Sequence, residues 1–190
     1  MKFIKKKLRS KFNLNQGIFS SQITLDTTVK VTDFYKTAPF PNFDDFQSKH
    51  DLTKIVENNI FLKDLKNHIG FGKTFVEVGS GTCQLSLALA TKTNNLIVAL
   101  DPTKDSLKLG KNFAKSNDIN NVVFLNADIF DDPCENNFFD YVWCSGVLHH
   151  TNNPKKGFEI ISSWVKPNGL IIIGLYNTIG RLRTNFRQII

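Results

Sequence analysis

Side chains that could bind a nucleoside or an amino acid recur just after four apolar runs of the sequence. Because ligands bind outside the carboxyl ends of parallel strands, we expect these residues to meet in one pocket. The fourth run ends with a serine and a glycine, and the other three with carboxylates or a glycine turn. The candidate binding residues are Glu77, Gly79, Ser80, Gly81, Asp101, Asp128, Ile129, Ser145 and Gly146.

The first of these segments holds the pattern Gly-Ser-Gly behind a glutamate. Gly79 and Gly81 allow a sharp turn and a close approach of a ligand to the backbone. The dinucleotide fingerprint requires a third glycine at position 84, where the chain has Gln84. Glu77 is a poor neighbour for a phosphate and a good one for a positively charged amino group. A tight strand-to-helix turn without a ligand is the structural alternative.

Two further carboxylates suit a nucleoside. Asp101 lies 22 residues beyond Gly79 and could accept hydrogen bonds from both ribose hydroxyls. Its alternative role is a helix cap or a surface carboxylate. Asp128 could accept a bond from an exocyclic amine, while Ile129 or Phe130 stacks on the base. A capped turn is the alternative there.

Two adjacent histidines, His149 and His150, follow the fourth run. Neighbouring side chains point in different directions and no Cys or carboxylate lies at ligand spacing, so we expect no metal site. A histidine is suited to general-base chemistry near neutral pH, and the alternative is that both only shape the loop.

The three cysteines, at spacings of 51 and 10, indicate neither a disulfide framework nor a metal pair, and predict a reduced, cytoplasmic setting.

The elements that must position these residues alternate between strands and helices. Near-continuous apolar strands of this kind predict an α/β fold, a doubly wound parallel sheet covered on both faces. One long helix, from Asp51 to residue 69, is expected before the first strand. The predicted strands are 74–78, 96–100, 121–125, 139–144 and 170–173, with helices at 85–91, at 104–116 and from Pro154 onward.

Together these segments resemble the class I S-adenosylmethionine-dependent methyltransferases, in the branch of the type 11 and type 12 methyltransferase domains. The match covers about residues 70–175, and Cys83 and Asn168 stand where the family usually has glycine. The matching pieces are VEVGSGTC at 76–83, VALDPT at 98–103, NADIF at 126–130, and CSGVLHHTNNP through VKPNGLIIIG at 144–174.

This resemblance implies a Rossmann-like fold, S-adenosylmethionine as methyl donor and a small-molecule acceptor. The Gly79–Gly81 turn would cradle the methionine part, Glu77 would meet its amino group, and Ser145 and Gly146 would flank it. Asp101 would hold the ribose, and Asp128 with Ile129 the adenine. His149 or His150 would be the candidate base.

The family sheet normally has seven strands in the order 3-2-1-4-5-7-6. Only 14 residues follow Tyr176, too few for the last strands and their helix. We therefore expect a truncated domain with a five-stranded sheet in the order 3-2-1-4-5, lacking the usual hairpin of strands 6 and 7. Residues 177–190 could form one basic helix, and strand 170–175 would be an exposed edge.

The first 50 residues are expected to be a basic, aromatic and proline-rich lead-in to a domain at 51–190. Phe34, Tyr35, Phe40 and Phe43 should pack in an extended segment near the pocket mouth, and the alternative is plain core packing of the lead-in. Of the net charge of +7, residues 1–11 carry +6 and residues 181–187 carry +3, which leaves −2 for the rest. Basic ends of this kind are typical of solvated tails.

Two other function classes are considered. The basic ends could contact nucleic acid, which would make the chain a non-catalytic nucleic-acid-binding module. They could also make weak contact with an anionic membrane surface. No apolar run is long enough to span a membrane. A nucleotide-cofactor oxidoreductase is the enzymatic alternative, and Glu77 and Gln84 argue against it.

Overall fold

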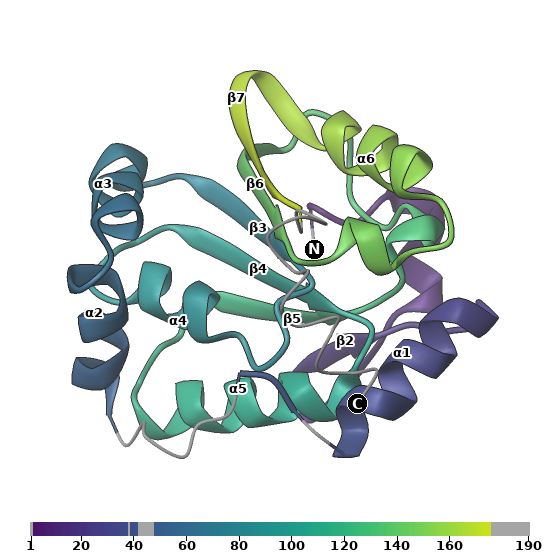
Figure 1. The fold of residues 1–190 in the computed structure, drawn as a ribbon, viewed down its shortest axis with the longest axis horizontal. Coiled ribbons are helices and arrows are strands. Elements are labelled where there is room, and N and C mark those ends of the chain that lie inside the picture. Colours follow the sequence, from purple (N-terminus) through teal and green to yellow (C-terminus); the bar gives the residue numbers. More distant parts are fainter. Residues whose placement is uncertain (1, 38, 42–47, 176–190) are drawn as a thin grey trace, which may run out of the picture.

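A twisted seven-stranded sheet forms the centre of the computed structural model, which describes residues 2–37, 39–41 and 48–175 (Figure 1). The strand order across the sheet is β1-β2-β5-β4-β3-β6-β7. The strands are β1 (Asn13–Asn15), β2 (Ile18–Ser20), β3 (Thr74–Val78), β4 (Leu96–Asp101), β5 (Val122–Asn126), β6 (Phe139–Ser145) and β7 (Val165–Gly174).

The prediction of a five-stranded sheet is wrong, because two strands from the N-terminal segment extend it. β1 pairs antiparallel with β2, and β2 pairs parallel with β5. The five longer strands are parallel to one another in the order β5-β4-β3-β6-β7. Strands of three residues show no alternating pattern long enough to detect in a sequence. The hairpin in the described sheet is therefore the N-terminal one, and the helix predicted at 177–190 lies outside the described residues.

The helices differ from the prediction in two places. The single helix expected at 51–69 is two, because Asn59 interrupts it and its side chain accepts a bond from the N–H of Leu62 at 3.1 Å. Asp51 lies inside the first of them, in a capping box with Ser48. The helices are α1 (Asp26–Thr37), α2 (Lys49–Glu57), α3 (Ile60–Ile69), α4 (Gln84–Ala90), α5 (Lys104–Ser116) and α6 (Pro154–Ser163), with short 3₁₀ turns η1 (Lys6–Lys11), η2 (Ile129–Asp131) and η3 (Leu148–His150).

The segment around Phe34 is also different from the expectation of an extended chain. Residues 26–37 form the helix α1. Of residues 34–43, which were expected to be extended, only 39–41 are both described and outside a helix. In Figure 1, α1 lies on the side of the sheet where β3, β4 and β5 end. The lead-in therefore brings a helix, and not only a stretch of aromatics, to the expected binding edge.

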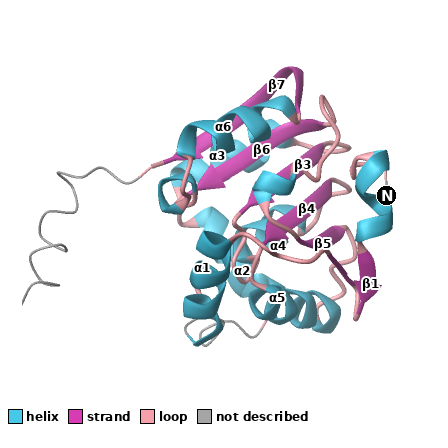
Figure 2. Ribbon diagram, turned by 90° about the vertical axis from the view of Figure 1, so that its right-hand side faces the viewer, coloured by secondary structure: helices cyan, strands magenta, loops and turns pink. Residues whose placement is uncertain are grey.

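Figure 2 shows the helices packed along the strands of the sheet. Alternating residues of the strands build two apolar layers, one on each face of the sheet. Phe75 and Ile97 point toward α2, α3, α4 and α5. Val76 and Val98 point toward α6, where Trp164 is completely buried. Because β3, β4 and β5 are buried on both sides, their sequences are nearly continuous apolar runs, as expected for parallel strands. Asn168 adopts a left-handed conformation with φ of 64° in the turn that leads into the paired part of β7.

The start of the chain is packed against the domain and is not a solvated tail. Phe3 and Ile4 are buried, and Ile4 forms an antiparallel bridge with Cys134. The N–H of Lys5 donates to the carbonyl of Pro133 at 3.0 Å, and its ammonium pairs with Asp132. Part of the N-terminal positive charge is thus matched by acidic residues of the domain.

Substituting Ile4 tests this packing. Ile4→Ala should lower the free energy of unfolding by about 2–5 kcal/mol, because a fully buried aliphatic side chain is lost and a cavity remains. Leu14→Ala on β1 is the matched control, since the Leu14 side chain is 62% exposed. Urea denaturation of both variants measures the difference. Equal, small losses would mean that the N-terminal segment contributes little to the fold.

Candidate functional site

One pocket opens at the carboxyl ends of β3, β4, β5 and β6, with a volume of about 280 Å³. It collects residues from turns that are far apart in the sequence, as parallel topology requires. Of the residues predicted from the sequence, those lining it are Glu77, Gly79, Ser80, Gly81, Asp101, Asp128, Ile129, Ser145, Gly146 and His150. His149 is not among the lining residues.

Glu77 is a buried carboxyl near the end of β3. Its Oε2 accepts two bonds from Ser86 on α4, one from the backbone N–H at 2.9 Å and one from the hydroxyl. Burial, with a smaller contribution from the nearby carboxyl of Asp101, raises the pKa of Glu77 to about 8 against the lowering effect of the Ser86 bonds. A positive charge in the pocket would stabilise the ionised form of this group.

Asp101 ends β4 and connects two turns of the site. One carboxylate oxygen accepts from the N–H of Gly81 at 2.8 Å, and the other accepts from the N–H of Thr103 at 2.7 Å. Burial raises the pKa of this carboxyl too, and the two backbone bonds oppose that rise. Because each carboxylate oxygen has two lone pairs, Asp101 retains capacity to accept bonds from a ligand. Two buried carboxyls in one pocket favour a ligand that carries positive charge.

The turn after β3 depends on backbone conformations that favour glycine. Gly79 and Gly81 have φ of 71° and 52°. A Cβ on Gly81 would lie only 2.2 Å from the carbonyl oxygen of Phe40, and the hydroxyl of Thr82 donates to the carbonyl of Pro41. The lead-in segment therefore rests directly on the glycine turn.

Cys83, where the related family usually has glycine, also adopts a left-handed conformation, with φ of 70°. A Cβ added to Gly110 of α5 would lie 2.9 Å from the Sγ atom of Cys83. Gly110 thus leaves the space that the Cys83 side chain occupies. The departure from glycine is compensated by packing on the neighbouring helix.

Asp128 follows β5 and is almost completely buried. Its Oδ1 accepts from the N–H of Phe130 at 2.9 Å, which caps η2, and its Oδ2 accepts from the hydroxyl of Thr28 on α1. The pocket is also lined by Thr27 of the same helix and by Leu25, which directly precedes it. Sequence reasoning missed these α1 residues, because the contact is formed across the fold and the helix has only a weak apolar pattern.

The aromatic residues of the lead-in are found partly where they were expected. Tyr35 and Phe40 line the pocket. Phe43 lies outside the described residues, as does the side chain of Phe34. The prediction that the lead-in packs at the pocket mouth therefore holds for the two aromatic side chains of this set that the structure describes.

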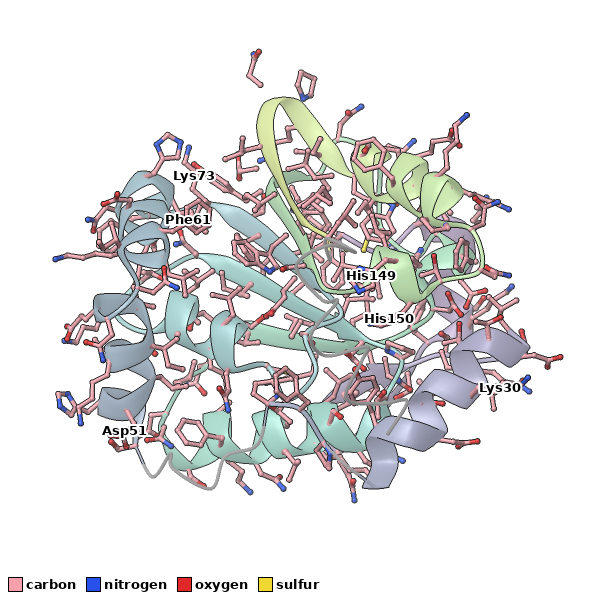
Figure 3. The ribbon with its side chains drawn as sticks, in the orientation of Figure 1. Lys30, Asp51, Phe61, Lys73, His149 and His150 are labelled. Carbon is pink, nitrogen blue, oxygen red and sulfur yellow. The ribbon has the colours of Figure 1, made fainter. Side chains whose placement is uncertain are left out.

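The two histidines lie side by side on the turn after β6, with ring centroids 4.2 Å apart (Figure 3). His150 faces the pocket and His149 does not line it. In the described part of the chain, no group of three or more His, Cys, Asp or Glu side chains is arranged to hold a metal ion. Among the same residues, no helix has the length and apolar character needed to cross a bilayer.

Comparison with known proteins identifies the class of this chain. Residues 70–189 match the family described as "Methyltransferase domain", so the chain belongs to this family of S-adenosylmethionine-dependent methyltransferases. A methyltransferase of Geobacter sulfurreducens, solved in complex with S-adenosylhomocysteine, shares the fold with a TM-score of 0.54 and 14% identity, over 80% of this chain and 56% of that one. The nucleotide-cofactor oxidoreductase considered above is not the class that the family match supports.

Two curated relatives give a narrower comparison. The demethylmenaquinone methyltransferase of Clavibacter sepedonicus is 31% identical over 107 residues, which is 56% of this chain and 42% of that protein. The ubiquinone biosynthesis O-methyltransferase of Glaesserella parasuis is 26% identical over 138 residues, 70% of this chain and 56% of that protein. The chain spans about half the length of these relatives.

The contact between the glycine turn and the lead-in can be tested at Gly81. Gly81→Ala should lower the free energy of unfolding by more than about 2 kcal/mol, because backbone strain adds to a clash with the Phe40 carbonyl. Gly72→Ala is the matched control: its φ is 68°, but an added Cβ would meet nothing within 4 Å. Urea denaturation measures both, and equal losses would contradict the close contact.

The raised pKa of Glu77 predicts how the ligand-free protein responds to pH. Between its ordinary value of 4.5 and about 8, folded Glu77 holds a proton that the unfolded chain releases, so stability falls as the pH rises through this window. The free energy of unfolding should fall by on the order of 2–4 kcal/mol between about pH 5 and pH 8. The fall should be smaller in Glu77→Gln and unchanged in Glu159→Gln, an exposed control on α6. Parallel curves for wild type and Glu77→Gln would show that Glu77 is not the titrating group.

Proposed function

We propose that the pocket binds S-adenosylmethionine and that the chain transfers its methyl group to a small, aromatic acceptor. The observation that carries this proposal is the convergence of three carboxyl groups, Glu77, Asp101 and Asp128, from the ends of three neighbouring parallel strands. Two of them are buried with raised pKa values, so they suit a ligand with cationic groups. Family membership makes that ligand S-adenosylmethionine.

Each part of the methyl donor has a matching side of the pocket. The Gly79–Gly81 turn, with Ser80, would hold the methionine portion, and Glu77 would meet its amino group. Asp101 would accept bonds from the ribose hydroxyls. We assign the adenine to Asp128 and Ile129.

Residues after β6 would complete the methionine side. Ser145 and Gly146 line the pocket beside the glycine turn, where a Cβ on Gly79 would lie 2.2 Å from Val147. The methyl donor supplies a methyl group on a positively charged sulfur, which is already an activated leaving group. The residues of this chain therefore have to align the acceptor and exclude water.

His150 is the better candidate for a general base, because it lines the pocket and His149 does not. A base is needed only where the acceptor atom carries a proton that must leave. His149 would then shape the turn that presents His150. The sequence leaves both histidines as candidates for the general base, and we propose His150 of the two.

The acceptor side is proposed from two kinds of support. Tyr35, Phe40 and Phe130 give the pocket an aromatic wall suited to a planar ring. The two relatives named above act, by their names, in menaquinone and ubiquinone synthesis. A phenolic or quinol-type ring is therefore the acceptor class to test first.

A cytoplasmic setting is proposed because all three cysteines are free and buried.

Ligand binding gives the direct test. In calorimetry, wild-type protein should bind S-adenosylhomocysteine and should bind NAD much more weakly. Asp101→Ala should weaken S-adenosylhomocysteine binding by about 1–3 kcal/mol, the scale of charge-assisted hydrogen bonds. Asp105→Asn is the matched control, because its carboxylate lies on α5 and pairs with Lys108. Tighter binding of NAD than of S-adenosylhomocysteine would overturn the proposal.

Activity is tested separately. Labelled S-adenosylmethionine is incubated with a metabolite extract and with a simple catechol, and products are sought that gain one methyl group. Transfer to an RNA or protein fraction alone would contradict a small-molecule acceptor. His150→Gln should reduce turnover with a phenolic acceptor more than it weakens cofactor binding.

A further inference from the structure

Thr28 makes a contact that none of the binding-site assignments above uses. It lies in the first turns of α1, and its hydroxyl donates to Oδ2 of Asp128. Both residues line the same pocket. The hydrogen bond therefore joins the lead-in helix to the carboxylate assigned to the adenine ring.

The two bonds to Asp128 fix the orientation of its carboxylate. The N–H of Phe130 donates a hydrogen bond to Oδ1 of Asp128 at 2.9 Å, and the Thr28 hydroxyl donates one to Oδ2. A carboxylate held at one oxygen can still rotate about its last torsion, whereas bonds from two different donors on separate oxygens fix its plane. Each oxygen keeps one further lone pair. Asp128 can therefore present an oriented acceptor to a ligand.

Thr28 comes from a part of the chain outside the family match, which begins at residue 70. The same lead-in is held at a second point, where Phe40 and Pro41 rest on Gly81 and Thr82. These two attachments place lead-in residues beside two different parts of the pocket, Asp128 and the glycine turn. The lead-in thus completes a site whose carboxylates come from the family domain.

We propose that Thr28 is a positioning residue that orients Asp128 to recognise the exocyclic amine of the adenine ring. The inference rests on the proposed binding of S-adenosylmethionine. It adds that α1 contributes to cofactor specificity. The amine of adenine donates to the carboxylate oxygen that Thr28 holds toward the pocket, and a purine that lacks this amine loses the bond.

The test compares two ligands: S-adenosylhomocysteine and its analogue in which hydrogen replaces the 6-amino group of the purine. Wild-type protein should prefer the amine by about tenfold or more, the scale of a hydrogen bond to a charged acceptor. Thr28→Val, which removes only the hydroxyl, should reduce this preference to about threefold or less. Thr28→Ser, which keeps a hydroxyl, should restore it. Calorimetry gives both affinities, and thermal melting confirms that each variant is folded.

Thr32→Val is the matched control on the same helix, because the Thr32 hydroxyl donates to the carbonyl of Val29 at 2.7 Å. It should leave the preference unchanged. In an Asp128→Ala background, which removes the acceptor, Thr28→Val should have no additional effect on the preference, since its action passes through the Asp128 side chain.

Three results would overturn the inference. If Thr28→Val weakens both ligands equally, Thr28 only supports the fold. If the wild type binds S-adenosylhomocysteine without preferring the amine, Asp128 does not read the adenine, while the proposed cofactor site stands. If the wild type does not bind S-adenosylhomocysteine at all, the proposed function fails, and this inference fails with it.

Discussion

The bond between the Asp101 carboxylate and the backbone N–H of Gly81 joins the end of β4 to the turn after β3. It fixes the position of a turn whose glycine backbone has no room for a Cβ. The same carboxylate holds the N–H of Thr103, just before α5 begins. One buried carboxylate at the end of β4 therefore fixes both the turn after β3 and the residue that precedes α5.

Burial is what makes this arrangement chemically useful. A carboxyl that is removed from water ionises less readily, so Glu77 and Asp101 are poised to respond to charge in the pocket. In the empty pocket their ionisation opposes folding, whereas a cationic ligand would offset that cost. A site that is costly without its ligand is typical of functional pockets.

The N-terminal segment has two roles in the structure, one in the sheet and one at the site. Phe3, Ile4 and the β1-β2 hairpin extend the core beyond β5. Further along, α1 contributes Thr28 and Tyr35 to the lining of the pocket, and Phe40 and Pro41 line it as well. Lys5 and Arg9 are drawn to Asp132 and Glu135, so part of the basic charge near the N-terminus serves to dock the segment. The division of the chain at residue 50, which the sequence suggests, stays a prediction.

The sequence pattern predicted a core of parallel strands and the residues at their carboxyl ends that line the pocket, whereas the order of those strands came from the family resemblance and the total number of strands was wrong. Apolar runs of five or six residues, each followed by a glycine or an acid, are local signals that topology brings together at one edge. The helix α5, for example, has the predicted bounds of 104–116. Glu77, Asp101 and Asp128 lie in one pocket because parallel strands end on the same side.

Only the tertiary structure decided the number of strands in the described sheet, the break at Asn59, the helical form of residues 26–37 and which of the two adjacent histidines lines the pocket. β1 and β2 are three residues long, and their stability comes from pairing with a strand distant in sequence, which no local pattern reveals. Thr28 meets Asp128 through a contact that spans 100 residues, and a lone threonine carries no sign of it. Local propensity and periodicity determine elements, whereas long-range contacts determine which side chains complete a site.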